Sequence, residues 1–463
     1  MARVTATRHV ASDLPVTAEL SRRLVKIDYD ALPEDIRTLA CQCLLDFLAV
    51  TLAGAGETLT GLLRDEALEE GATPLARLIG HPAKVSPQQA ALINGAASHA
   101  LDYDDVNLAM SGHPTVTILP ALLALAEARG ANGRELLAAF VAGYETACRI
   151  GALVLPGHYT RGFHATATLG SFGAAAACAH LLGLNAETTA IALGIAATQA
   201  AGLKSMFGTM CKPLHAGLAA RNGLVAGKLA ARGFLSRPDA LECAQGFAAT
   251  HGPDFDPQAA LGEAAGGFHL RNNLFKYHAA CYLTHAPIEC ARTLRHDHAI
   301  TPDAVRTAEL RVDAGASAVC HIPVPKTGLE AKFSLRLTTA FALAGIDTAR
   351  LDTYSERTVN DPAVTRLRDK VAVEFMPGWP PTLAELRVTL VDGRTVTQRH
   401  DSAEPTCDLD AQGHRLAAKF FSLADPVLGR ARAERIAAVV AAFDRHQKVN
   451  DLTELCVPQV ATP

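Results

Sequence analysis

Three carboxylates crowd into four consecutive positions of the sequence, and a histidine follows them closely. Asp102, Asp104 and Asp105 share one short segment, and His113 lies just before Pro114. A carboxylate beside an imidazole can orient the ring and set its tautomer, so this segment could transfer a proton. The competing interpretation is a solvated acidic loop that caps the next helix. A metal site is a third interpretation, although no helical His-x-x-x-His pattern accompanies the segment.

A histidine and a lysine each stand where a helix is expected to begin. His164 precedes an alanine- and glycine-rich run, and the free N–H groups and positive dipole end of a helix favour a nearby anion. Lys212 stands just ahead of Pro213 and another expected helix, with His215 on its first turn. A lysine there gains nothing from the helix dipole, so binding of an anionic substrate explains it better than a structural role. A buried histidine with satisfied hydrogen bonds is the alternative for His164.

A further group of candidates combines a lysine with two histidines. Lys276 and His278 flank Tyr277, and His285 follows seven residues after His278, which predicts roughly the same helix face. We expect this group at the junction of two domains, where ligand sites tend to form. A surface cation is the alternative interpretation of Lys276.

The elements that must position these residues are mostly helices. Gly170 and Gly173 interrupt one alanine-rich run, and each glycine costs about 1 kcal/mol against alanine in an exposed helix. Close helix–helix contact explains both glycines better. Such packing fills a core without large side chains, which fits an aromatic content of 5%. The expected helices cover residues 34–54, 88–100, 115–128, 134–152, 165–183, 186–202 and 214–232.

The hydrophobic period changes from helical to alternating near residue 300. Residues 308–313, 371–375 and 386–391 are strand-like, and Asp392-Gly393 predicts a tight hairpin turn into 394–399. Helices are expected at 331–346 and 428–444. We therefore predict a mainly α protein: a large all-α domain at 15–270, completed by C-terminal helices at about 405–463, and a smaller α+β domain at 271–404.

Composition excludes several classes of function. The chain has 463 residues, is 49% hydrophobic and carries a net charge of −4. A nucleic-acid-binding protein usually has a basic excess, so we expect no nucleic-acid partner. The sequence has no run of the ~18 apolar residues that a membrane span needs, and residues 1–14 do not resemble a secretory signal. We therefore expect a cytoplasmic protein with no membrane partner.

Cysteines and cofactor motifs add further exclusions. The 11 cysteines are scattered, which is typical of buried thiols, and Cys41 and Cys43 lack the second cluster of a zinc site. The sequence also has no glycine-rich phosphate loop, dinucleotide-binding fingerprint or G-x-S-x-G elbow. Phosphoryl, hydride and serine acyl transfer therefore lose support.

Taken in order, the candidate segments resemble the MmgE/PrpD family over nearly the whole chain. This family includes 2-methylcitrate dehydratase, cis-aconitate decarboxylase and iminodisuccinate epimerase. The segments that carry the resemblance are Asp-Tyr-Asp-Asp at 102–105, Gly-His-Pro-Thr at 112–115, Gly-Phe-His-Ala-Thr at 162–166, Lys-Pro-Leu-His-Ala-Gly at 212–217 and Lys-Tyr-His at 276–278.

The resemblance implies a helical domain with a smaller α+β lid domain, a homodimer, and an enzyme without metal or organic cofactor. It implies chemistry at a carbon beside a carboxylate of a small di- or tricarboxylate. The family's active-site pattern falls on Asp102, His113, His164, Lys212 and Lys276. We expect the lysines to hold carboxylates, a histidine to exchange the proton, and Asp102 to orient it. We also expect substrate contacts from His215, His278 and His285.

The expected reaction is elimination of water from a hydroxylated di- or tricarboxylate, as in 2-methylcitrate dehydratase. Epimerisation of an amino- or imino-dicarboxylate, decarboxylation of the cis-aconitate type and a non-catalytic scaffold are the alternatives. Two positions depart from the pattern of the decarboxylase and dehydratase members. Val106 stands where they usually have a threonine, and Leu337 where they tend to have a tyrosine.

Overall fold

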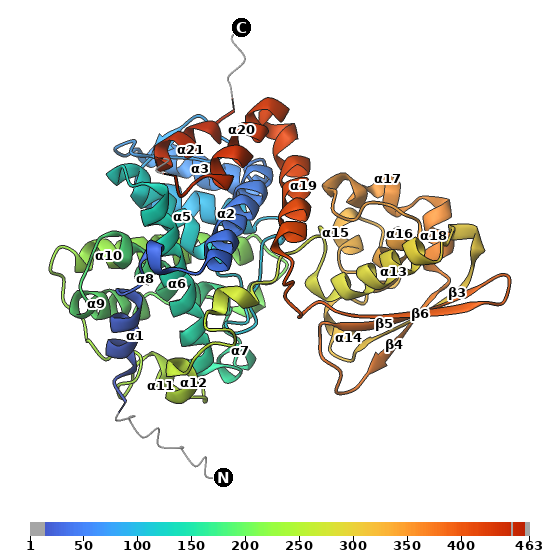
Figure 1. Cartoon of the computed structure of the whole chain (residues 1–463), viewed down its shortest axis with the longest axis horizontal. Coiled ribbons are helices and arrows are strands. Elements are labelled where there is room, and N and C mark those ends of the chain that lie inside the picture. The colour runs from blue at the N-terminus through green and yellow to red at the C-terminus, as the bar shows by residue number, and fades with distance from the viewer. Residues whose placement is uncertain (1–13, 446–447, 459–463) are drawn as a thin grey trace, which may run out of the picture. The chain divides into compact units, whose positions relative to one another are not determined.

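The computed structural model describes residues 14–445 and 448–458, and these form two compact units (Figure 1). The first unit contains the described residues up to Asn273 and those from Asp408 onward. The second unit is the intervening segment, Leu274–Cys407. The protein is mainly α, as predicted.

The first unit is built from helices joined by short loops. Its longer helices are α1 (Val16–Leu24), α2 (Glu34–Gly54), α3 (Thr58–Glu70), α4 (Pro87–His99), α5 (Thr115–Arg129), α6 (Gly133–Val154), α8 (Ala165–Leu181), α9 (Ala186–Ala197), α10 (Cys211–Ala230), α19 (Leu409–Leu428), α20 (Arg430–Ala441) and α21 (Val449–Leu455). Its shorter helices are α7 (Gly157–Thr160), α11 (Phe247–His251) and α12 (Pro257–Leu261).

Three local expectations for this unit were wrong. The helix expected at 186–202 ends at Ala197, and the following residues run as a loop toward α10. The unit is also not strictly all-α, because β1 (Ala76–Arg77) and β2 (Lys84–Val85) pair antiparallel across a turn at Gly80. The third is the position of Lys212, which lies inside α10 and not ahead of it.

Close helix packing explains the alanine- and glycine-rich sequence. A Cβ atom on Gly143 of α6 would lie 2.5 Å from the carbonyl oxygen of Gly173 in α8. A Cβ atom on Gly217 of α10 would lie 2.1 Å from the carbonyl oxygen of Leu92 in α4. Only glycine permits this approach, so backbone proximity replaces aromatic bulk in the core. Helices α2 and α6 are long and apolar enough to span a membrane, but most of each is buried inside the unit, as in core helices.

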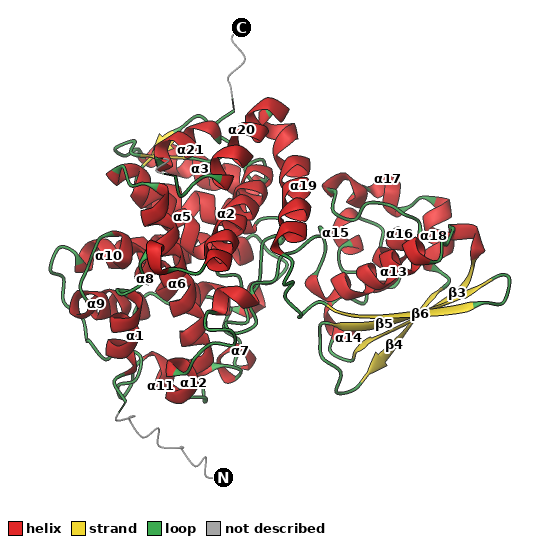
Figure 2. Ribbon diagram, viewed as in Figure 1, coloured by secondary structure: helices red, strands yellow, loops and turns green. Residues whose placement is uncertain are grey.

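The second unit contains a four-stranded sheet with the order β4-β3-β5-β6 (Figure 2). The strands are β3 (Val305–Asp313), β4 (Val371–Met376), β5 (Leu383–Leu390) and β6 (Thr395–Asp401). Strand β3 pairs parallel with β4 and antiparallel with β5, and β5 and β6 form the predicted hairpin. Gly393 supplies the positive φ, 92°, that the hairpin turn requires.

Helices pack on this sheet through one apolar cluster. They are α13 (His285–Asp297), α16 (Leu335–Leu343) and α18 (Pro362–Arg368), with the short helix α14 (Ala316–Val319). The short helices α15 (Gly328–Ala331) and α17 (Glu356–Val359) contact each other beside this cluster. Ile288 of α13, Leu310 of β3 and Leu343 of α16 share the cluster. The helix expected at 331–346 is shorter, because the Ser334 side chain accepts a hydrogen bond from the N–H of Leu337 and caps α16 there.

Candidate active site

The acidic segment forms the loop between α4 and α5. Helix α4 ends at His99, and Asp102 adopts a left-handed conformation with φ of 50°. Gly112 lets the loop approach α8 closely, because a Cβ atom there would lie 2.9 Å from the backbone nitrogen of Thr166. The backbone N–H of His113 donates to the Thr166 hydroxyl at 3.2 Å. The loop is therefore fixed against the start of α8.

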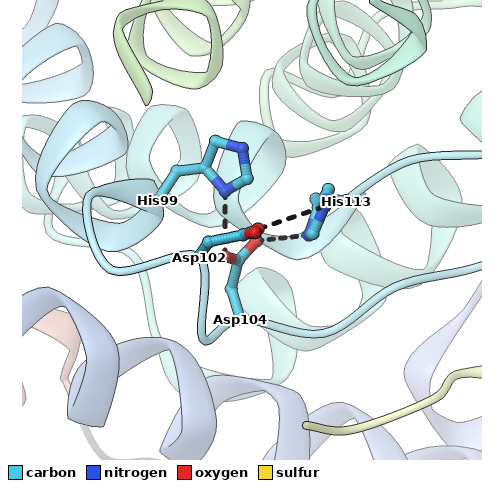
Figure 3. Close-up of side chains that lie close together, drawn as sticks. All are labelled: His99, Asp102, Asp104 and His113. Atoms are coloured by element: carbon cyan, nitrogen blue, oxygen red, sulfur yellow. Dashed lines mark hydrogen bonds and ion pairs between the residues drawn. The ribbon is translucent and has the colours of Figure 1, made fainter. Parts of the chain in front are cut away.

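Asp104 lies between two imidazoles (Figure 3). The Nδ1 atom of His99 is hydrogen-bonded to Oδ1 of Asp104 at 2.9 Å, and Nδ1 of His113 lies 2.8 Å from its Oδ2. The ring centroids of the two histidines are 4.5 Å apart. His99 and Asp104 are each 1% exposed. This trio forms the buried back of the site.

Asp102 and Lys212 form a more accessible ion pair in front of this trio. The Lys212 Nζ atom lies 2.7 Å from Oδ1 of Asp102, and the Nε2 atom of His113 lies 3.8 Å from the same oxygen. The side chains of Asp102 and Lys212 are 34% and 18% exposed. Lys212 lies in the first turn of α10, where the helix dipole opposes a cation, so an anion beside it is favourable.

His164 precedes α8 and contacts a second histidine. Its Nδ1 atom lies 3.0 Å from Nδ1 of His215, so one ring must donate its proton to the other. The Phe207 ring meets His164 edge-on at 4.9 Å, and the centroid of His99 lies 6.1 Å from that of His164. Burial, followed by the charges of neighbouring histidines and Lys212, lowers the pKa of His164. Burial also lowers the pKa of His215.

Burial and charge set the protonation states at the back of the site. Burial lowers the pKa of His99 to about 4, against the raising effect of Asp104, so its imidazole is neutral at physiological pH. Burial alone would raise the pKa of Asp104, but His113 and His99 beside it hold that pKa well below its usual value. Asp104 is therefore an ionised carboxylate.

The third carboxylate of the loop has a hydrogen-bond partner outside this group. Asp105 accepts a hydrogen bond from the Thr115 hydroxyl, and burial raises its pKa to about 7. Behind it, the buried Lys419 of α19 forms an ion pair with Asp46 of α2 at 2.6 Å and donates to the carbonyl oxygen of Tyr103 at 2.6 Å. Lys419 of the C-terminal helix α19 thus holds the acidic segment in place through the Tyr103 carbonyl.

The remaining candidates gather within the second unit. Lys276, His278 and His285 are all at most 3% exposed. His278 is hydrogen-bonded to Glu289 at 3.0 Å through Nε2 and to the Thr348 hydroxyl at 2.7 Å through Nδ1. The expectation of one shared helix face was wrong, because His278 lies in a loop and His285 is the first residue of α13. Their rings nevertheless meet edge-on at 5.0 Å.

Each unit therefore brings together its own set of predicted residues. Asp102, His113, His164, Lys212 and His215 meet in the first unit, and Lys276, His278 and His285 meet in the second. The roles assigned to them stay predictions.

Sequence reasoning missed the residues that complete these groups. It assigned no role to His99 or Phe207, and it counted Asp104 only as part of an acidic cluster. The available signal for His99 was its place at the end of an alanine-rich run, three residues before Asp102. Phe207 gives no such signal, because it reaches His164 only through the path of the loop before α10.

The two departures from the family pattern are both apolar and largely buried. Val106 follows the acidic residues in the loop and is 9% exposed, and Leu337 is buried in α16. Neither side chain can donate or accept a hydrogen bond.

Four residues could supply ligands to a metal ion. One donor atom each from His99, Asp102, Asp104 and His113 lie within 4.8 Å of one another. The shortest separations are 2.9 Å for the hydrogen bond from His99 to Asp104 and 2.8 Å for the ion-pair contact of His113 with Asp104. Around a tetrahedral zinc ion with bonds of about 2.0–2.1 Å, ligand atoms lie roughly 3.3 Å apart. The geometry therefore fits hydrogen bonding better than metal ligation.

Known proteins are similar to this chain over most of its length. The MmgE/PrpD N-terminal domain model matches residues 18–260, and the MmgE/PrpD C-terminal domain model matches residues 278–445. The cis-aconitate decarboxylase of Aspergillus terreus (strain NIH 2624 / FGSC A1156) is 27% identical, with 97% of each chain covered. Those of Mus musculus and Homo sapiens are 27% and 29% identical, with 95% and 80% of this chain and 93% and 80% of the relative covered. Since the matched domains account for most of the sequence, the chain belongs to the MmgE/PrpD family.

Proposed function

We propose that this protein is a lyase that decarboxylates a small unsaturated tricarboxylate of the cis-aconitate type. The observation that carries the proposal is the arrangement of Asp102, Lys212 and His113, which places a cation for a carboxylate beside a proton-exchanging imidazole. The names of the relatives favour decarboxylation over the elimination of water that the sequence alone favoured. The proposed reaction uses no metal or organic cofactor.

Lys212 would supply the electrostatic stabilisation. In a decarboxylation the bond to one carboxylate carbon breaks, carbon dioxide leaves, and the electron pair stays on the remaining carbon framework until a proton arrives. Stabilising that developing charge is usually the largest catalytic contribution. The partial exposure of Lys212 and Asp102 supports this role, because a substrate carboxylate can reach the ammonium group.

A histidine would deliver the proton, and His113 and His164 are the two candidates. His113 lies beside the Asp102–Lys212 pair, with its Nε2 atom 3.8 Å from Oδ1 of Asp102. His164 lies between His215 and the Phe207 ring, and its lowered pKa makes it a neutral imidazole at physiological pH. Such a ring can accept a proton on one nitrogen while it donates from the other.

Lys276 is the second lysine that we propose for carboxylate binding. Lys276 is 1% exposed and lies in the same unit as His278 and His285. Burial, followed by the charges of His278 and Lys276, lowers the pKa of His285. This concentration of positive and titratable groups supports the binding of a second carboxylate. The lid function, the homodimeric state and the cytoplasmic location expected above belong to the same proposal.

Epimerisation of an amino- or imino-dicarboxylate is the second candidate. The observation that favours it is the loss of two hydroxyl groups at Val106 and Leu337, where the decarboxylase and dehydratase members usually carry them. An epimerase needs only two proton-exchanging groups on opposite sides of one carbon.

Incubation with cis-aconitate in D₂O, followed by proton NMR and carbon dioxide detection, tests the proposal. We expect carbon dioxide and a product that carries one deuterium from solvent. Hydration or dehydration of the substrate without carbon dioxide would identify a hydro-lyase. Deuterium at the stereocentre of an amino- or imino-dicarboxylate, with no new alkene, would identify an epimerase. A parallel preparation from host cells that lack this protein is the control in every arm and excludes contaminating enzymes.

A further inference from the structure

We propose that Asp104 is a positioning residue that fixes the tautomers of His99 and His113 at once, and that His99 is a second positioning residue, which acts through Asp104. The inference rests on the proposed function only in requiring that His113 exchange a proton. It concerns two residues behind the Asp102–Lys212 pair that need not touch the substrate.

The tautomers follow from hydrogen-bonding chemistry. An ionised carboxylate can only accept hydrogen bonds. The Nδ1 atom of His99 is hydrogen-bonded to Oδ1 of Asp104 at 2.9 Å, so it carries a proton. The Nδ1 atom of His113 lies 2.8 Å from Oδ2 in an ion-pair contact that is not aligned as a hydrogen bond, and at that distance a proton on Nδ1 is needed to avoid repulsion between lone pairs. In a neutral imidazole the other nitrogen, Nε2, then holds the lone pair. Asp104 thus selects the same tautomer in both rings.

This selection determines which atom of His113 can work. With a proton fixed on Nδ1, the nitrogen that can take up a proton is Nε2, which lies 3.8 Å from Asp102 on the side of Lys212. When Nε2 receives a proton, the ring becomes a cation, and Asp104 lies in contact to stabilise it. The arrangement therefore directs proton exchange toward the accessible front of the site.

His99 holds the carboxylate in the required orientation. Its Nδ1 occupies one oxygen of Asp104 and leaves the other for His113 (Figure 3). Its Nε2 atom is buried and has no hydrogen-bond partner among the residues that the structure describes. Only the Nδ1 side of this ring is therefore used, as expected of a residue that orients another group.

The first experiment observes the tautomers directly, without substrate. Histidine labelled with ¹⁵N is examined by long-range ¹H–¹⁵N correlation at mildly alkaline pH, and spectra of His113→Gln and His99→Asn assign the signals. We expect both rings in the Nδ1–H form. In Asp104→Asn the amide offers one acceptor and one donor, so at least one ring must change to the Nε2–H form. An Nε2–H form of His113 in the unmodified protein would overturn the proposal even if Asp104→Asn does not fold.

The second experiment separates positioning by His99 from direct contact with substrate. Asparagine places an amide N–H where Nδ1 of histidine lies, whereas leucine removes that donor, and both remove Nε2. We expect His99→Asn to keep turnover within a few-fold of the unmodified protein and His99→Leu to lose about 10²-fold or more, the usual scale for a misdirected acid–base group. Equal losses in both variants would contradict a role through Asp104.

His180→Gln is the matched control for removal of a buried imidazole. His180 lies on α8, 16 residues beyond His164, which corresponds to about 24 Å of helix. Its Nε2 contacts the carbonyl oxygen of Ile27, and glutamine can preserve that contact. We expect unchanged turnover and an unchanged pH profile. Because the tautomers are read without turnover, inactivity toward cis-aconitate would refute the proposed function and leave this inference standing.

Discussion

The ion pair between Lys419 and Asp46 gives a quantitative test of how the site loop is anchored. Both side chains are 2% exposed, so the energetics are those of a buried pair and not of a surface pair. Lys419→Met keeps the length of the side chain and removes its charge, which leaves the Asp46 carboxylate buried without this cation. Removal of one partner from a buried pair costs about 3–5 kcal/mol in the free energy of unfolding.

The double variant Asp46→Leu with Lys419→Met separates the charge from the packing. Replacing both members of a buried pair with apolar groups is often nearly neutral. The Tyr103 carbonyl still loses the charged donor that lies 2.6 Å away, and a hydrogen bond to a charged group is worth about 1.5–3 kcal/mol. We therefore expect the double variant to be more stable than Lys419→Met alone.

Urea unfolding followed by two probes is the appropriate assay. Far-ultraviolet circular dichroism reports mainly the helices of the first unit. Fluorescence reports the second unit, because the single tryptophan of the chain is Trp379. For Lys419→Met we expect the urea midpoint measured by circular dichroism to fall and the midpoint measured by fluorescence to stay unchanged. Arg237→Ala, which removes the exposed ion pair with Asp239 in the first unit, should change neither midpoint. A loss below about 1 kcal/mol for Lys419→Met, or a double variant as unstable as the single one, would refute the reasoning.

Three further predictions follow from other parts of the first unit. Lys212→Ala should lower turnover by about 10²-fold or more with unchanged circular dichroism, and near-normal activity of the folded variant would remove Lys212 from the site. The pKa of Asp105 is raised from 3.8 to about 7, so the stability that its protonated form contributes is present below about pH 4 and is lost as the pH rises through 7. Asparagine cannot ionise, so the urea midpoints measured at about pH 5 and 8 should differ less for Asp105→Asn than for the unmodified protein. Gly217→Ala should destabilise by about 1–3 kcal/mol or more in urea unfolding, because its Cβ would lie 2.1 Å from the Leu92 carbonyl oxygen, whereas Gly61→Ala in α3, with 3.9 Å to the nearest atom, should not destabilise.

Local patterns in the sequence were sufficient to predict most helices and the hairpin. The alanine-rich runs keep helical periodicity, and Asp392-Gly393 specifies a tight turn whatever surrounds it. The errors fell at the ends of helices, where a cap or a neighbouring loop sets the boundary. Ser334 caps α16 and shortens the helix expected at 331–346. The end of α9 at Ala197 precedes the loop in which the Gly202 carbonyl oxygen accepts the N–H of His164.

The sequence was sufficient to predict individual residues of the candidate site but not the contacts between them. Residue type and helix position pointed to His113, His164 and Lys212. The contact of His215 with His164 joins α10 to the start of α8, and no local pattern encodes it. The division of the acidic segment, with Asp104 toward the histidines and Asp105 toward Thr115, depends on loop geometry that a sequence pattern does not specify.

The return of the chain into the first unit after Cys407 has a consequence for synthesis on the ribosome. Lys419, which anchors the carbonyl of Tyr103, is translated 316 residues after it. At a rate of about 5–20 residues per second, that separation corresponds to roughly 15–60 s. During this interval the nascent first unit lacks α19, and Asp46 lacks its buried cation. The loop that carries Asp102 and Asp104 can therefore reach its final form only after the entire second unit has been made.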